Sequence, residues 1–247
     1  MPRLDIQIPT PDGQSNGSLH IPEGDGPRPG VLVFPDAGGL RDAFRQMGDH
    51  LAELGFVALV PDIYYRAGDW APFDMANVFS DQKERARLGS LMGSLTNDRI
   101  ISDAGAYAEF LLNRPEVSGN AIGTTGYCLG GRMSIIAAGG LGDTIAAAAS
   151  FHGGGLAVAD QPTSPHLAAD RISATVYVAG AQEDNSFTAE QAELLDHALT
   201  EAGVDHTVEF YQAHHGFAVS DNQTYDTDAA ARHWAALQQL YQTQLAN

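Results

Sequence analysis

Short apolar runs alternate with amphipathic stretches along most of the chain. Residues 31–34 are all apolar, which is typical of a strand covered on both faces. Apolar residues then recur at spacings of three and four from Phe44 to Leu54, and Gly55 ends this predicted helix. Because the alternation repeats, we predict a mainly parallel central sheet with helices on both faces. The other predicted strands are 56–60, 121–125, 146–151, 175–178 and 207–211, and the other predicted helices cover 101–111, 192–202 and 230–241.

Several segments carry signals other than this alternation of strands and helices. Two short amino-terminal strands, 4–8 and 18–21, are joined through Pro9-Thr10-Pro11-Asp12-Gly13, which predicts an amino-terminal edge hairpin because proline cannot donate to a sheet ladder. Thr188-Ala189-Glu190-Gln191 is a capping box that opens a helix. No linker divides residues 1–247, so we predict one domain. Segment 64–97 carries aromatic residues among polar ones, which favours equally a lid or cap over a site and ordinary surface packing.

Composition narrows the class of protein. The 247 residues are 44% apolar and 18% charged, too apolar for a disordered chain. Lys and Arg number 13 against 31 Asp and Glu, a net charge of −18, so neither nucleic acid nor an anionic membrane is an expected partner. No secretory signal or membrane-length apolar run is visible, which favours a cytoplasmic protein. Oligomeric state leaves no trace in the sequence.

A single cysteine carries the strongest chemical signal. Cys128 cannot form an internal disulfide or a multi-thiolate metal site. It lies in Gly126-Tyr127-Cys128-Leu129-Gly130-Gly131, which has the G-x-nucleophile-x-G form between a predicted strand and helical sequence. Glycines two residues to either side relieve crowding on such a turn, and the helix N-terminus favours a thiolate. We therefore predict a nucleophilic Cys128 rather than an inert buried thiol.

A nucleophilic cysteine needs a base, and the base needs a group that orients it. Ligands gather beyond the carboxyl ends of parallel strands. Two strands downstream of Cys128 lead into candidates: Glu183 and Asp184 follow the first, and His214 and His215 follow the second. Asp184 is favoured because a turn follows it, and His215 because Gly216 permits a sharp bend; Glu183 and His214 remain open alternatives.

These segments, together with Pro61-Asp62-Ile63-Tyr64 and His215-Gly216-Phe217, closely resemble the dienelactone hydrolase family, a cysteine branch of the α/β-hydrolases. The resemblance spans nearly the whole chain. It implies an α/β-hydrolase fold, no cofactor, and cleavage of a small ester or lactone through a Cys128–His215–Asp184 triad and a thioester. It also implies an oxyanion hole formed by the backbone N–H groups of Ala37 and Leu129. In this family an acidic residue at the position of Asp36 controls the charge of the cysteine; the family often has the longer Glu.

This sequence departs from the family pattern at one place that concerns the substrate. Family members that cleave dienelactone hold its carboxylate with arginines, one of them soon after the histidine, and residues 216–220 contain none. The resemblance is therefore better evidence for the chemistry than for the substrate. Candidate substrate contacts are Tyr64, Arg85, His152 and Phe217.

Two functions of other classes compete with the hydrolase. One is a metal-dependent hydrolase with ligands such as His152, His166 and His214, although no ligand pair at helical spacing supports it. The other is a non-catalytic ligand-binding protein on a hydrolase scaffold.

Overall fold

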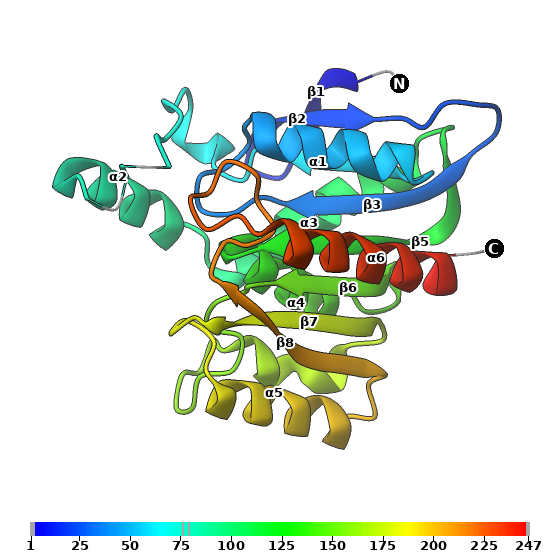
Figure 1. Cartoon of the computed structure of the whole chain (residues 1–247). Helices are drawn as coiled ribbons and strands as arrows, with labels where there is room; N and C mark the ends of the chain where they lie inside the picture. Colours follow the sequence, from blue (N-terminus) through cyan, green and yellow to red (C-terminus); the bar gives the residue numbers. More distant parts are fainter. Residues whose placement is uncertain (1–2, 76, 79, 246–247) are drawn as a thin grey trace.

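The computed structural model describes residues 3–75, 77–78 and 80–245, and its centre is one eight-stranded sheet (Figure 1). The strand order is β1-β2-β4-β3-β5-β6-β7-β8. Strands β3 to β8 pair in parallel, whereas β1 and β2 pair antiparallel with each other and β2 with β4. The mainly parallel sheet is thus confirmed. Strand bounds are β1 Arg3–Thr10, β2 Gly13–His20, β3 Arg28–Phe34, β4 Val57–Pro61, β5 Val117–Tyr127, β6 Ile145–Phe151, β7 Thr175–Glu183 and β8 His206–His214.

Helices cover both faces of the sheet, as the apolar pattern predicts. Side chains from α1 and α6 pack with Val31 and Val33 of β3, whereas α3, α4 and α5 pack on the opposite face with Leu32 and Phe34. Alternation along one strand therefore supplies two separate cores. The helices are α1 Asp42–Glu53, α2 Gln82–Gly93, α3 Asn97–Leu112, α4 Leu129–Leu141, α5 Ala189–Glu201 and α6 Thr227–Gln244, with short 3₁₀ turns at Tyr65–Ala67, Gly142–Thr144 and Pro165–Arg171.

The amino-terminal hairpin lies at the edge of the sheet, as expected, but its turn is shorter than the sequence suggests. Pro9 and Thr10 continue β1, and Thr10 pairs with Gly13. Pro9 is tolerated because β1 is an edge strand, where a missing N–H leaves no neighbour unpaired.

The predicted capping box at α5 forms only in part. Thr188 accepts a hydrogen bond from the Gln191 backbone N–H at 3.4 Å, but the Gln191 side-chain oxygen is buried without a partner. None of the helices in the described residues is long and apolar enough to cross a membrane.

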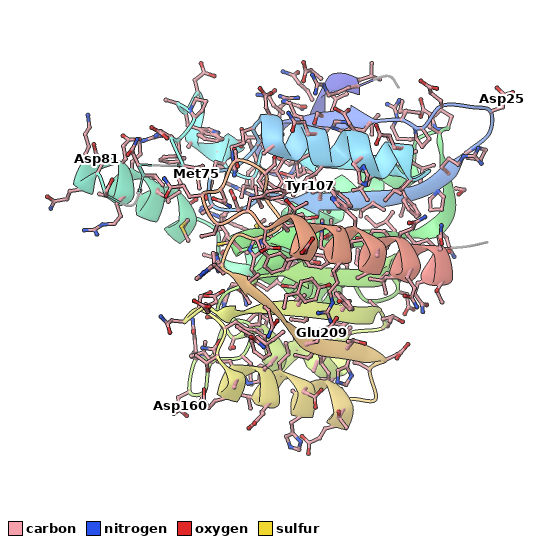
Figure 2. The ribbon with its side chains drawn as sticks, viewed as in Figure 1. Asp25, Met75, Asp81, Tyr107, Asp160 and Glu209 are labelled. Carbon is pink, nitrogen blue, oxygen red and sulfur yellow. The ribbon has the colours of Figure 1, made fainter. Side chains whose placement is uncertain are left out.

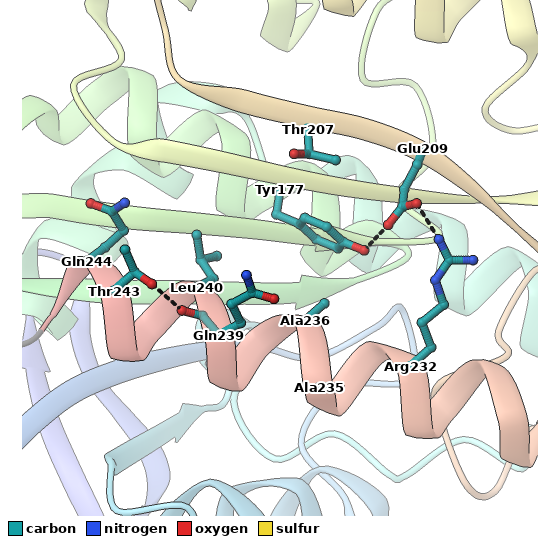
Figure 3. Close-up of a pocket in the computed structure, with 10 residues that line it drawn as sticks. All are labelled: Tyr177, Thr207, Glu209, Arg232, Ala235, Ala236, Gln239, Leu240, Thr243 and Gln244. Atoms are coloured by element: carbon teal, nitrogen blue, oxygen red, sulfur yellow. Dashed lines mark hydrogen bonds and ion pairs between the residues drawn. The ribbon is translucent and has the colours of Figure 1, made fainter.

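A hollow of about 420 Å³ opens between α6 and the strands β7 and β8, the latter at the edge of the sheet (Figure 3). Its lining includes Tyr177, Glu209 and Arg232, joined in a chain in which Glu209 accepts hydrogen bonds from the other two. None of the candidate site residues lines it.

Candidate functional site

Cys128 occupies a strained turn between β5 and α4. Its φ of 54° and ψ of −114° are unusual for a residue with a side chain, and the thiol residue is partly exposed. A Cβ on Gly126 would lie 1.9 Å from the Gly130 carbonyl oxygen, and one on Gly130 would lie 2.1 Å from that of Phe34. Both positions therefore require glycine, and they let α4 begin directly after Cys128 with its N-terminus at the sulfur.

The two candidate acids and the two candidate histidines form two pairs, and these pairs lie in different environments. Asp184 Oδ2 lies 2.6 Å from His215 Nδ1, and the Asp184 side chain is only 5% exposed. Glu183 and His214 face each other at 3.5 Å, with side chains 72% and 59% exposed. A solvated pair at that distance holds a ring only weakly, so the arrangement suited to orienting a base is the one between Asp184 and His215.

Ser186 extends this pair and is a residue that sequence reasoning missed. Its backbone N–H and its hydroxyl both donate to Asp184 Oδ1, at 2.8 and 2.7 Å. Burial alone would raise the pKa of Asp184, but the hydrogen bonds from His215 and Ser186 lower it below its ordinary value. The carboxylate is thus held ionised and fixed in orientation.

His215 is held strongly basic. Burial alone would lower its pKa, but hydrogen bonds with Asp184 and Cys128, together with their negative charges, raise it to about 10. At neutral pH the geometry therefore favours an imidazolium between a carboxylate and the sulfur.

The loop after β3 brings Ala37 to the same end of the sheet. Ala37 is 4% exposed, and its carbonyl accepts a hydrogen bond from the Tyr64 hydroxyl at 3.0 Å. Tyr64 is itself 2% exposed and packs edge-on against Trp70. Tyr64 therefore fixes the loop. Leu129 is the first residue of α4, a position whose N–H has no acceptor within its own helix.

Asp36 is engaged by an arginine that the sequence did not single out. Arg41 Nη1 and Nη2 donate to the two carboxylate oxygens of Asp36 at 2.6 and 2.9 Å. The same guanidinium donates through Nε and Nη2 to Asp221, at 2.7 and 2.8 Å. Although burial alone would lower it, these hydrogen bonds raise the pKa of Arg41. Asp36 is thus committed to an ion pair that joins its loop to the loop after His215.

Helix α2 projects beyond the carboxyl ends of the parallel strands (Figure 1). Met75 lies on that side of the molecule (Figure 2), and a Cβ on Gly38 would lie 2.5 Å from its sulfur. One apolar cluster joins this segment to both proposed oxyanion residues: Ala37, Phe73, Val78 and Leu88, with Trp70, Met75, Leu91, Met92 and Leu129 against them. Residues 76 and 79 of segment 64–97, the latter an aromatic one, lie outside the described residues.

The remaining candidates lie in different environments. Arg85 is exposed on α2, and its side chain shares no hydrogen bond or ion pair with a site residue in the described chain. Phe217 and His152 are fully buried against each other, with ring centroids 5.0 Å apart, behind His215. The histidines considered as metal ligands are not gathered: within the described residues no three His, Cys, Asp or Glu side chains are placed to hold a metal ion.

Solved structures share this architecture. The crystal structure of a "Putative Dienelactone Hydrolase" from Klebsiella pneumoniae superposes with a TM-score of 0.82 at 21% identity, covering 97% of this chain and 98% of that one. The dienelactone hydrolase-like promiscuous phosphotriesterase P91, from metagenomic libraries, gives 0.75 at 28% identity, covering 98% of both chains. The α/β-hydrolase fold is therefore confirmed.

Sequence comparison points the same way. A "Putative carboxymethylenebutenolidase" of Synechocystis sp. is 31% identical over 210 residues, 84% of this chain and 82% of that protein. The carboxymethylenebutenolidase of Pseudomonas sp. strain P51 is 28% identical over 182 residues, 72% and 69% of the two chains. The model of the dienelactone hydrolase family matches residues 16–245. The chain therefore belongs to the dienelactone hydrolase family.

Proposed function

We propose that this protein hydrolyses neutral esters or lactones through a Cys128–His215–Asp184 triad. The observation that carries the proposal is the 2.6 Å contact between Asp184 and His215, whose pKa is raised to about 10 by hydrogen bonds with both Asp184 and Cys128, despite burial. The cysteine itself lies on the strained turn at the start of α4.

The reaction begins when His215 takes the proton of the Cys128 thiol, which leaves a thiolate beside an imidazolium. The sulfur of Cys128 attacks the carbonyl carbon, forming a C–S bond, and the negative charge moves to the carbonyl oxygen. The N–H groups of Leu129 and Ala37 stabilise this oxyanion, each contributing about 2.7–4 kcal/mol by analogy with other oxyanion holes. The C–O bond then breaks, and His215 gives its proton to the leaving alkoxide. The products of this half are an alcohol and a thioester.

Hydrolysis of the thioester needs a neutral His215. Once the thiolate is consumed, one of the negative charges that raise the pKa of His215 is gone. The ring can then take a proton from water as the hydroxyl oxygen attacks the thioester carbon. Collapse of this intermediate releases the carboxylic acid and restores the thiolate beside the imidazolium, so one water is consumed for each ester cleaved.

The charge around the site favours a neutral substrate. Arg41 is the cation of the oxyanion loop, and Asp36, Asp221 and the Gly39 carbonyl accept its hydrogen bonds. It has no capacity left for a substrate carboxylate. The chain carries 18 net negative charges, so an anionic ester is also repelled at long range.

The apolar cluster over the oxyanion residues suggests what the substrate carries beside the ester. Trp70, Met75 and Leu88 pack with Ala37 and Leu129, so these three side chains act as a cap that favours an apolar or aromatic group near the reacting carbon.

Two experiments test the proposal. Cys128→Ala should abolish hydrolysis of an aryl ester, and iodoacetamide should inactivate the wild-type protein by modifying Cys128. Full activity of the variant would contradict the proposal, and binding of esters without turnover by the wild type would favour a non-catalytic binding protein.

A substrate panel then tests the charge argument. Dienelactone, its neutral methyl ester, aryl esters of graded size and a neutral phosphate triester should be compared; the triester is included because P91 is named a phosphotriesterase. We expect higher kcat/KM for neutral esters than for the anionic lactone. Preference for the anionic substrate would overturn the argument from Arg41.

A further inference from the structure

A buried imidazole next to the proposed base has no hydrogen-bond partner. His152 follows β6 directly, its side chain is 0% exposed, and neither Nδ1 nor Nε2 has a partner in the described structure. Burying two unpaired ring nitrogens costs free energy that a phenylalanine at this position would not cost. Because neither nitrogen bonds to a neighbour, His152 acts on the residues around it through ring contact alone.

The backbone of His152 is also strained. Its φ is 40°, and Cys128 and Asp160 are the only other residues with side chains in the described chain that have positive φ. The Cys128 N–H donates to the Phe151 carbonyl at 3.1 Å, and the His152 N–H donates to the Ala179 carbonyl at 2.8 Å. The strained residue is therefore held between the cysteine turn and β7, the strand that leads to Asp184.

The ring of His152 contacts the ring of the base. The centroids of His152 and His215 lie 5.1 Å apart at an interplanar angle of 64°, and Phe217 packs edge-on against His152 from another side at 5.0 Å and 80°. Asp184 holds His215 through one nitrogen only. The Ser186 hydroxyl meets the same nitrogen at 3.3 Å. Even with the hydrogen bond to Cys128, the ring can still rotate about the line through its two nitrogens, and the contact with His152 opposes this rotation.

The missing partners have a consequence for charge. A carboxylate beside His152 would draw a proton onto it, and a second imidazolium would oppose the charge that His215 must carry. Burial, together with the nearby His215 and His233, instead lowers the pKa of His152 far below its ordinary value, against a smaller opposite effect of Asp184. The ring therefore stays neutral whichever state His215 occupies.

We propose that His152 is a positioning residue for His215. Its dry, uncharged ring holds the imidazole of His215 in the orientation that reaches both Asp184 and Cys128. The inference rests on the proposed role of His215, and it assigns to His152 a contact with the base rather than with the substrate.

Three variants separate ring contact from polarity. His152→Phe keeps a neutral ring, His152→Asn keeps a polar group without the ring, and His152→Ala keeps neither. We expect the Phe variant to retain kcat within about threefold, and the Asn and Ala variants to lose about tenfold or more in kcat with KM little changed. The pH dependence of thiolate absorbance should shift in the Asn and Ala variants, because the imidazolium is held less well beside Cys128.

Melting temperatures identify any variant that fails to fold, and the Phe and Asn proteins keep the test valid if the Ala protein is lost. A Phe variant as inactive as the Ala variant would overturn the proposal, because the nitrogens would then be needed. An Ala variant with wild-type kcat and an unchanged thiolate titration would overturn it as well. If instead Cys128→Ala retains full activity, the proposed function fails, and this result is distinct from either of those.

Discussion

Hydrogen-bond geometry at single residues does not by itself identify a catalytic group in this protein. Ser18 Oγ lies 2.8 Å from His20 Nε2, and His20 Nδ1 lies 2.8 Å from Asp49 Oδ1. These three hydrogen-bonded side chains have the residue types and the connectivity of a serine-hydrolase triad. However, Ser18 is 0% exposed and His20 is 1% exposed, so no substrate reaches them. Their hydrogen bonds instead link β2 to α1, where a Cβ on Gly48 would lie 2.4 Å from the His20 ring.

The pairing of Asp184 with His215 leads to a prediction at the same scale. Asp184→Asn removes the negative charge that raises the pKa of His215 and presents an amide that favours the wrong tautomer. We expect kcat/KM to fall by about 10²–10⁴-fold. The alkaline limb of the pH–rate profile, where imidazolium is lost, should move below the wild-type position near the His215 pKa of about 10.

Glu183→Gln is the matched control, because Glu183 is the neighbouring carboxylate and pairs with the exposed His214. Its kcat/KM should stay near wild type. If Glu183→Gln were the damaging change and Asp184→Asn the harmless one, the acid of the triad would be Glu183.

At the scale of elements, the loops between strands and helices are tied together by charge. Arg41 precedes α1 and links Asp36, after β3, to Asp221, which follows β8. The guanidinium is 10% exposed and Asp36 4%, so the pair is nearly dry. Because the two loops carry Ala37 and His215, the arginine also sets the spacing between the proposed oxyanion donor and the proposed base.

Removing one partner of the Arg41–Asp36 pair should destabilise the fold, because the other charge is then buried alone. Arg41→Met leaves the Asp36 carboxylate buried without its cation, and we expect the free energy of unfolding in urea to fall by about 3–5 kcal/mol. The double variant Arg41→Met with Asp36→Asn removes both charges and should recover much of that loss. A double variant no more stable than Arg41→Met alone would show that the arginine stabilises the fold through packing rather than charge.

At the scale of the whole molecule, several histidines are buried in the neutral state. Burial is the largest cause in each case: it lowers the pKa of His20, holds that of His152 far below its ordinary value, and lowers that of His233 from 6.5 to about 3. Protons therefore bind the unfolded chain more readily than the folded one below pH 6.5. His215 has the opposite shift, and its contribution is fully present below 6.5 and is lost only as the pH rises through about 10.

The free energy of unfolding should therefore fall as the pH drops from 6.5. At about pH 5, a histidine whose pKa is lowered as far as that of His233 reduces the free energy of unfolding by about 2 kcal/mol. Urea unfolding at several pH values measures this loss. The pKa of Asp184 is lowered, so its stabilising effect is lost only below the ordinary range of a carboxyl and does not explain a change in this window. His233→Leu should reduce the slope with pH, even if it lowers stability at every pH; an unchanged slope would contradict the assignment.

The part of the structure that could be predicted depended on local pattern. Apolar periodicity identified the strands of the parallel sheet and most of the helices around it, because each element buries one face or both. It missed the true length of β1, since Pro9 is compatible with an edge strand although it usually breaks one. It also could not settle segment 64–97, where Trp70 and Phe73 pack with Ala37 and Leu129, which lie far away in the sequence.

The sequence by itself determined the fold class, the glycine-flanked turn of Cys128, and the order in which the candidate cysteine, acids and histidines follow along the chain. These features follow from contacts within a few residues or from regular spacing. Only the tertiary structure decided that Asp184 pairs with His215, that Arg41 joins Asp36 to Asp221, and that His152 lies against His215. The physical reason is that each of these contacts depends on how separate strands end at one edge of the sheet; Arg41 and Asp221, for example, are 180 residues apart in the chain.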